Sequence, residues 1–368
     1  LSGAIDVYWN TTKDLLMKTT IASSSGYSYQ YKNMGQTSNK GVELQLDAIV
    51  VDAKDFGLNF NFNISYNRGK IDKLNGSSFW QSSSWAGTAA AGIEDFLVEE
   101  GGRLGEVYGY KTDGFYTAND FTFDAEKGTY ALKEGVNDCS SLIGGKVYPG
   151  SIKLKANEDG EYKKERLGNT VPTVSGGFGL NARWKGFDFT AFFNYSLGNK
   201  IVNATKLGSS FYSGSSKNWN INDHFTSASR YSWIDSSTGT NLLSSASIKA
   251  NGEAWTINRL NEINSNASIW NPAAATVMPL VDWAVEDGSF LRVNNITIGY
   301  TLPKLLVNKL NIQNIRIYVT GYNLHCFTKY SGTDPEVDCC TSTPMTPGID
   351  YAAYPKSRSF VGGINVTF

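Results

Sequence analysis

Residues 58–66 alternate strictly between apolar and polar side chains. Their sequence is LNFNFNISY, so every even position carries Leu, Phe, Ile or Tyr, and every odd position carries Asn or Ser. Successive side chains of a β-strand point to opposite faces, so a period of two predicts a strand with one apolar and one polar face. We expect Phe60, Phe62 and Ile64 to point away from any water-filled interior.

The same alternation recurs along the whole chain, and no comparable helical pattern competes with it. Seven further segments carry it: residues 5–9, 42–46, 178–184, 187–195, 296–300, 315–319 and 360–368. One design repeated in this way predicts an all-β protein with eight antiparallel strands.

The connections between these segments differ systematically in length. Short turns are predicted at residues 51–57, 184–187 and 302–311, and long connections at residues 11–40, 70–173, 198–288 and 324–357. A bacterial outer-membrane barrel has short periplasmic turns and long extracellular loops, whereas a soluble sandwich has no reason to place its long loops at one end. The pattern therefore predicts a transmembrane antiparallel β-barrel, and all three short turns become periplasmic if the C-terminus is periplasmic.

The low content of charged residues suggests that part of the protein surface does not face water. Charged residues make up only 18% of the chain, against about 25% in typical soluble domains. The polar positions of the strands are mostly Asn, Ser and Thr, which suits a water-filled or plugged lumen. Aromatic residues gather at strand ends, where membrane-interface girdles would place them. The alternative, in which these rings cap a soluble core, remains open.

Charge argues against nucleic acid as a partner. The formal net charge is −1, and nucleic-acid binding normally requires a clustered basic surface. No apolar run approaches the roughly 20 residues that a membrane-spanning helix needs.

The sequence leaves three alternatives for the state of the cysteines. A disulfide between Cys326 and Cys339 would close a loop of roughly 13 residues in an oxidising compartment and is the preferred interpretation. Free thiols are the second. A zinc site built from His325, Cys326, Cys339 and Cys340 is the third, but its spacing does not match structural zinc sites. We expect no metal and no cofactor.

Seven short motifs occur in order along the chain. They are residues 12–16 (TKDLL), 39–44 (NKGVEL), 107–114 (VYGYKTDG), 289–303 (SFLRVNNITIGYTLP), 321–324 (GYNL), 329–336 (KYSGTDPE) and 359–368 (SFVGGINVTF). In order and spacing they resemble the C-terminal half of the SusC/RagA group of TonB-linked (TonB-dependent) outer-membrane transporters. The ending, with Ile364, Val366 and Phe368, resembles the signal by which outer-membrane barrels are recognised for assembly.

The resemblance implies a specific architecture. Residues 1–368 would form the C-terminal part of a barrel of about 22 strands, wide enough to need a plug. The plug domain, the TonB-contacting segment and the first barrel strands would lie outside this sequence. The opening at Leu1, without an initiator or a signal peptide, fits a fragment or a cleaved chain. Eight to ten strands taken from a larger barrel leave two open edges, so we expect a missing N-terminal portion to pair with both.

The resemblance also implies a function in the outer membrane. Members of the group import large nutrients such as oligosaccharides or oligopeptides across the lipid bilayer. A SusD-like surface lipoprotein acts as the lid, the TonB complex supplies the energy, and two transporter units form a homodimer. A soluble or lipid-anchored surface β protein that binds glycans is the alternative, because it would share the alternating strands and the aromatic loops.

Contacts with substrate or lid are expected from aromatic residues of the long loops, since such rings stack on sugars or peptide side chains. The candidates are Trp80, Trp85, Tyr212, Trp219, Tyr231, Trp233, Trp255 and Trp270. The alternative role of the same rings is to pack the loops together.

Catalysis is not expected. The acidic pairs at residues 94–95 and 99–100 look like a solvated segment, and His224 and His325 lack a nucleophile motif. Residues 157–162 (NEDGEY) occupy the position of an acidic loop in the resembled group, but too few acidic residues remain for a calcium site. A simple turn is the preferred interpretation there.

Overall fold

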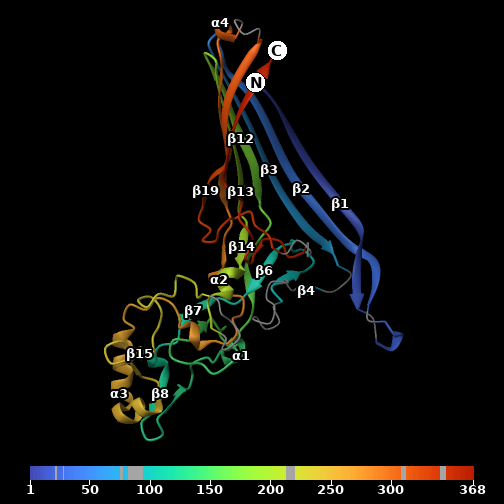
Figure 1. The fold of residues 1–368 in the computed structure, drawn as a ribbon. Coiled ribbons are helices and arrows are strands. Elements are labelled where there is room, and N and C mark those ends of the chain that lie inside the picture. Colours follow the sequence, from blue (N-terminus) through green and yellow to red (C-terminus); the bar gives the residue numbers. More distant parts are fainter. Residues whose placement is uncertain are drawn as a thin grey trace.

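The computed structural model describes residues 1–20, 23–27, 29–74, 78–81, 94–212, 220–307, 312–339 and 345–368. Its main element is one long, curved, eight-stranded sheet (Figure 1). The sheet order is β1 (Ser2–Thr20), β2 (Tyr29–Asp52), β3 (Phe56–Lys73), β12 (Val174–Trp184), β13 (Phe187–Leu197), β18 (Phe290–Thr301), β19 (Asn314–Thr328) and β21 (Ser359–Thr367). All neighbours are antiparallel, so each of the eight alternating segments is confirmed as a strand.

Strand register brings the apolar positions onto one face. Phe62 lies opposite Leu46 on one side and Phe178 on the other, and Phe178 lies opposite Phe193. The rings of Phe178 and Phe193 stack with centroids 4.6 Å apart. Because a shift of one residue would reverse a strand's faces, this register holds the whole apolar set on the same side.

No core covers this apolar face in the described residues. Ile298, Val319 and Ile364 remain 56%, 56% and 65% exposed, and Phe60 and Phe62 are only half-buried. The buried hydrophobic clusters lie in the loops, apart from Ile71 at the loop end of β3, and contain none of these residues. The sheet is therefore a single layer with an uncovered apolar side, as the alternation predicts.

The opposite face carries a hydrogen-bonded polar row. Asn59, Asn181, Thr190, Thr297 and Thr320 lie next to one another across five strands. The Thr190 hydroxyl donates to Asn181 Oδ1 over 3.0 Å, and the hydroxyls of Thr297 and Thr320 are 2.8 Å apart. Four of the five uncharged side chains are thus hydrogen-bonded in pairs, and the row forms a hydrophilic surface.

The two ends of the sheet differ. The short turns and both chain termini lie at one end, together with α4 (Lys304–Val307), and the long loops lie at the other (Figure 1). The tightest turn joins β12 to β13 through Lys185 and Gly186, whose φ angles of 45° and 91° are the positive values that a two-residue hairpin requires.

One predicted connection is wrong. Residues 11–40 form no long loop, because β1 continues to Thr20 and β2 begins at Tyr29, with Thr12 opposite Thr37. Bulges interrupt the pairing after Thr12, where Asp14 adopts a φ of 58°, and this hides the alternation in the sequence. The two strands extend past their neighbours as a ribbon (Figure 1).

Both sheet edges are open. In the described residues β1 pairs only with β2, and β21 pairs only with β19, so no pairing closes the sheet between residues 3–10 and 360–368. No helix in the described part of the chain is long and apolar enough to cross a membrane.

The three remaining long connections fold together into what we call the loop domain. Its strands and helices are β4 (Phe79–Gln81), β5 (Phe96–Val98), β6 (Glu106–Gly109), β7 (Thr112–Phe115), β8 (Phe121–Asp124), β9 (Thr129–Leu132), α1 (Ser140–Ile143), β10 (Ile152–Leu154), β11 (Glu165–Asn169), β14 (Lys200–Asn203), α2 (Ala204–Gly208), β15 (Ile234–Asp235), β16 (Thr240–Asn241), α3 (Ser245–Ile263), β17 (Val285–Asp287) and β20 (Ile349–Asp350).

All three loops contribute to one buried core. Phe121 comes from the first loop, Val202 and Leu260 from the second and Ile349 from the third, and each is fully buried in the same cluster. Val202 of β14 also pairs with Ile349 of β20 in parallel. The loop domain therefore exists only when the three connections are present together.

Candidate binding surfaces

Two of the predicted contact aromatics belong to the core of the loop domain. Tyr231 is 1% exposed and Trp270 is 4% exposed. The Trp270 indole donates to the Ser210 carbonyl over 3.1 Å and packs edge-on against Phe225. Burial also raises the pKa of Tyr231 above its ordinary value. In this structure, both side chains hold the loops together, which is the alternative role that the sequence left open.

Trp233 and Trp80 are intermediate cases. The Trp233 indole donates to the Pro149 carbonyl over 2.5 Å, and its ring lies 5.7 Å from that of Tyr148. Trp80, on the short strand β4, packs edge-on against Tyr108 at 5.6 Å and remains 38% exposed. Each ring is anchored on one side and accessible on the other.

Tyr212 and Trp255 are the exposed candidates. They expose 50% and 45% of their surface, and Trp255 lies on α3, which Gly252 interrupts with a φ of 76°. Trp85 and Trp219 lie outside the described residues. Of the described candidates, Tyr212 and Trp255 are the most accessible to a ligand or a partner protein.

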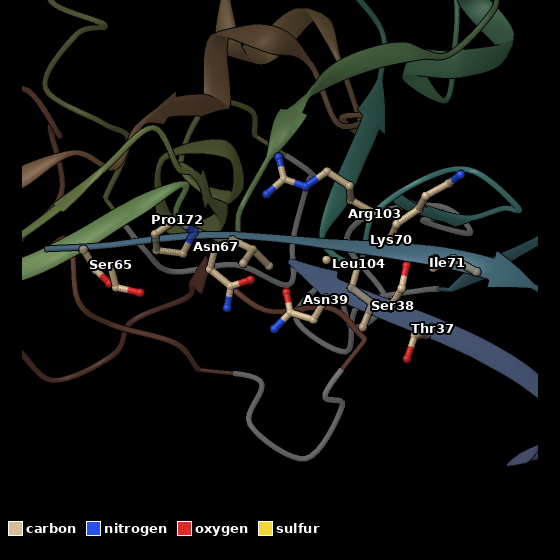
Figure 2. Close-up of a pocket in the computed structure, with 13 residues that line it drawn as sticks. Thr37, Ser38, Asn39, Ser65, Asn67, Lys70, Ile71, Arg103, Leu104 and Pro172 are labelled. Atoms are coloured by element: carbon tan, nitrogen blue, oxygen red, sulfur yellow. The ribbon is translucent and has the colours of Figure 1, made fainter. Parts of the chain in front are cut away.

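A hollow of about 470 Å³ lies where β2 and β3 meet the loop domain. Figure 2 shows Asn39, Ser65 and Asn67 pointing to one side of β3, which is the side of the polar row. Asn39 Oδ1 is buried and has no hydrogen-bond partner. Uncharged amide and hydroxyl groups of this kind can hydrogen-bond sugar hydroxyls or peptide amides.

This hollow was not predicted from the sequence. The available signal was the phase of the alternation, because Asn67 continues the series of odd-numbered polar residues on β3. Locating the hollow also requires the strand register that brings Asn39 and Gly69 together.

A buried ion cluster fixes the third loop to the sheet. Arg292 of β18 is 4% exposed and pairs with both Asp334 and Glu336. Glu336 also pairs with Lys356 at 2.8 Å and accepts a hydrogen bond from Asn194. Two of the sequence motifs, residues 289–303 and 329–336, meet here, so their shared role in this structure is to hold the loop in place.

The predicted disulfide is not formed. Cys326 is a free thiol on β19, opposite Arg292 in the strand register. Cys339 instead packs against the core of the loop domain, and its backbone N–H donates to the Ile349 carbonyl over 2.8 Å. The fold directs the two residues into different surroundings. The described residues also contain no group of His, Cys, Asp or Glu suited to a metal ion, and Cys340 lies outside them.

The acidic segments make structural contacts. Glu99 accepts a hydrogen bond from the Tyr108 hydroxyl, and Glu100 accepts one from the Leu74 backbone N–H. In the NEDGEY segment, Asn157 Oδ1 accepts from the backbone N–H groups of Asp159 and Glu161 at 3.1 and 2.7 Å. This side chain closes the expected turn.

The three residues of the suggested assembly signal lie at the open edge of the sheet. Ile364 and Val366 pair with Ile317 and Ile315, and Phe368 follows the last strand with 81% of its surface exposed. Their role in assembly remains a prediction.

An ion pair outside the sheet gives the loop domain an expected pH dependence. Asp235 accepts hydrogen bonds from Arg259 Nε and from the Ser237 hydroxyl, both over 2.6 Å. These contacts, Arg259 first, hold the pKa of Asp235 far below its ordinary 3.8. A carboxyl group whose pKa is lower in the folded state stabilises the fold when the pH is above its unfolded-state pKa. This stabilisation is lost as the pH falls below that value.

Substituting Asp235→Asn should therefore weaken the loop domain at neutral pH, and the difference from the original protein should shrink below a pH of about 4. Hydrogen exchange of α3 across a pH series measures this directly. A difference that grows in acid would contradict the assignment.

The chain is similar to known proteins along its whole length. No protein-family model matches it. It is 29% identical over 378 residues to TonB-dependent receptor P3 of Formosa agariphila, and 23% identical over 376 residues to TonB-dependent receptor SusC of Bacteroides thetaiotaomicron. Both alignments span 100% of this chain but only 32% and 30% of the receptors. The chain thus covers about a third of the length of these relatives.

A solved structure agrees in fold. The RagAB peptide importer in its closed-closed state superposes with a TM-score of 0.64 at 24% identity, covering 100% of this chain and 33% of the matched chain. Both curated relatives are named as TonB-dependent receptors. The chain is homologous to part of the TonB-dependent receptors, SusC among them, and shares the fold of the corresponding part of the RagAB importer.

Proposed function

We propose that this chain forms the C-terminal part of a barrel that actively imports large nutrients across the bacterial outer membrane. The observation that carries the proposal is the uncovered apolar face, which runs across all eight strands while the loops gather at one end. A lipid bilayer suits such a face, because apolar side chains then avoid water and the polar row faces a lumen.

The open edges support a larger closed barrel. Unpaired backbone groups in hydrocarbon cost several kcal/mol each, so β1 and β21 require partners within the membrane. We propose that strands from the rest of a barrel of about 22 strands pair with both edges. In this arrangement the C-terminus and the short turns are periplasmic, the loop domain is extracellular, and Ile364, Val366 and Phe368 act in assembly.

The cargo and the partners follow by analogy. RagAB is named as a peptide importer, and several relatives are named TonB-dependent. We therefore propose an oligopeptide or oligosaccharide as cargo, the TonB complex as the energy source, and a SusD-like lipoprotein as a lid over the loop domain. A homodimer of such units is the expected assembly. The hollow beside Asn39 and Asn67, which Lys70 and Arg103 also line, offers neutral hydrogen-bonding groups that suit either cargo.

The test is to express the full-length protein containing this chain and follow it in a flotation gradient. The proposal requires it to float with outer membranes, to need detergent for extraction, and to import labelled oligosaccharides or peptides only while the inner membrane is energised. A protein that stays in aqueous buffer and binds glycans without import would support the surface-binding alternative.

Combined substitution of Tyr212 and Trp255 by Ala tests the exposed aromatics. We expect uptake or lid binding to fall about tenfold, as for loss of about 1.4 kcal/mol of contact energy, while the thermal stability of the protein stays the same because both rings are exposed. Uptake and lid association are measured separately. The matched control is Lys127→Ala with Lys163→Ala, two exposed loop residues. Unchanged values in both assays would remove Tyr212 and Trp255 from the contact surface.

A further inference from the structure

A group of basic residues lies on the apolar face of the sheet at its loop end. Arg68 and Lys70 occupy even positions of β3, in phase with Phe62 and Tyr66. Lys40 of β2 lies directly opposite Arg68, so it projects from the same face. All three basic side chains are exposed.

The first long loop adds a fourth cation to this group. The Gly102 carbonyl accepts a hydrogen bond from the Ile71 N–H over 2.9 Å, and the Gly101 N–H donates to the Ile71 carbonyl over 2.8 Å. These bonds hold the loop alongside β3. Figure 2 shows Arg103 and Lys70 across β3 from Asn67 and Ser65, and all four residues line the hollow described above.

The positive charges lie close together without ion-pair partners. Burial and the positive charge of Arg68 lower the pKa of Arg103, and the nearby negative charge of Glu106 opposes this only in part. Of the acidic neighbours, Glu106 pairs with Arg166 at 2.7 Å. Asp72 accepts a hydrogen bond from the Ser38 hydroxyl over 3.0 Å through Oδ1, while its Oδ2 has no hydrogen-bond partner, so Asp72 offsets part of the positive charge. Among the described residues, no ion pair involves any of the four cations. Like charges gathered without a paired counter-charge favour an anion from outside the chain.

The height of the group along β3 indicates which anion. The apolar positions of β3 run from Phe56 to Tyr66, and ten residues at about 3.3 Å, tilted by about 40°, cover about 25 Å. That matches the apolar band of an outer-membrane barrel. On this face of β3, Arg68 is the next residue after Tyr66, which is the level where lipid headgroups would begin.

We propose that Lys40, Arg68, Lys70 and Arg103 form a binding site for the phosphate groups of an outer-leaflet glycolipid, whose acyl chains lie on the adjoining apolar face. This site rests on the proposed function, since it requires the apolar face to be in the membrane. A lipid-linked phosphate suits the site better than a free one because the cations and the apolar surface are continuous.

The experiment uses the full-length protein in detergent and three probes: phosphorylated lipid A, dephosphorylated lipid A and inorganic phosphate. Native mass spectrometry measures lipid binding, and inorganic phosphate is added as a competitor. The test variant is Arg68→Gln, Lys70→Gln, Arg103→Gln. One control variant exchanges Arg and Lys at the same three positions, and another removes three exposed loop cations by Lys127→Gln, Lys155→Gln and Lys163→Gln.

The proposal expects the original protein to prefer phosphorylated lipid A, and the test variant to bind it about 100-fold more weakly, at roughly fivefold for each cation. Both controls should keep the preference, and millimolar inorganic phosphate should not displace the lipid. Four results would each overturn the lipid site. The two forms of lipid A could bind equally, the test variant could bind as well as the original protein, or free phosphate could displace the lipid. The test variant could also keep lipid binding but lose binding of an acidic protein partner. Flotation of the test variant with outer membranes is scored separately, so failure of the lipid site is distinguishable from failure of the barrel assignment.

Discussion

Substitution of Phe62 by Arg should strongly impair stable insertion of the sheet into a bilayer. Phe62 lies midway along the apolar stretch of β3, and its ring stacks on Phe60 and Tyr195 with centroids 6.5 Å apart in each case. An Arg on the lipid side of a barrel costs about 2–4 kcal/mol at the middle of the bilayer, and loss of the ring contacts adds to this. Heat-modifiable migration and equilibrium unfolding of the full-length protein in lipid vesicles measure the effect.

The matched control is Asn59→Arg, on the same strand but on the polar face. Asn59 is exposed there and lies opposite Asn181, so the new charge enters a hydrated environment and should cost less than about 1 kcal/mol. If Asn59→Arg were the damaging substitution and Phe62→Arg were tolerated, the two faces would be assigned the wrong way round and the membrane model would fail.

Substitution of Arg292 by Met should release the third loop from the sheet. The change leaves Asp334 buried at 3% exposure without its cationic partner. Breaking a buried ion pair from one side costs about 3–5 kcal/mol, because the remaining charge loses its compensation. Hydrogen exchange should show loss of protection across residues 331–339 and 345–357, with most of the sheet unchanged.

Two further variants isolate the cause. Adding Asp334→Asn and Glu336→Gln to Arg292→Met removes the stranded charges and should restore much of the protection. Arg316→Met breaks the more exposed pair with Asp188 on the same polar face and should leave the third loop protected. Full protection of the loop in Arg292→Met itself would show that other contacts hold it.

The strands and their faces were predictable because a strand with one apolar and one polar face shows this difference in its sequence pattern. In residues 58–66 each side chain lies either on the apolar face or on the polar face, and its residue type shows which face it occupies. The long β1–β2 ribbon was not predictable in this way, because around Lys13 and Asp14 both faces are polar and a bulge shifts the phase. Where neither face is apolar, alternation carries no information.

The candidate site was harder to predict for a different reason. Trp270 and Trp255 are the same residue type in the same long connection, yet one is buried and the other exposed, because contacts between segments distant in sequence decide the outcome. Arg292 shows the same difficulty, since its partners follow 42 and 44 positions later. The prediction of a disulfide between Cys326 and Cys339 was wrong because residues close in sequence need not lie in the same environment.

The shared core of the loop domain has an evolutionary consequence. Since Phe121, Val202 and Ile349 come from three different loops and fill one interior, a graft of a single loop from a relative would bring unmatched packing surfaces with it. Under the proposed function, changes of cargo should therefore arise by point substitutions on the outside of the domain or by recombination that replaces all three loops at once. Engineering of this surface should follow the same boundaries.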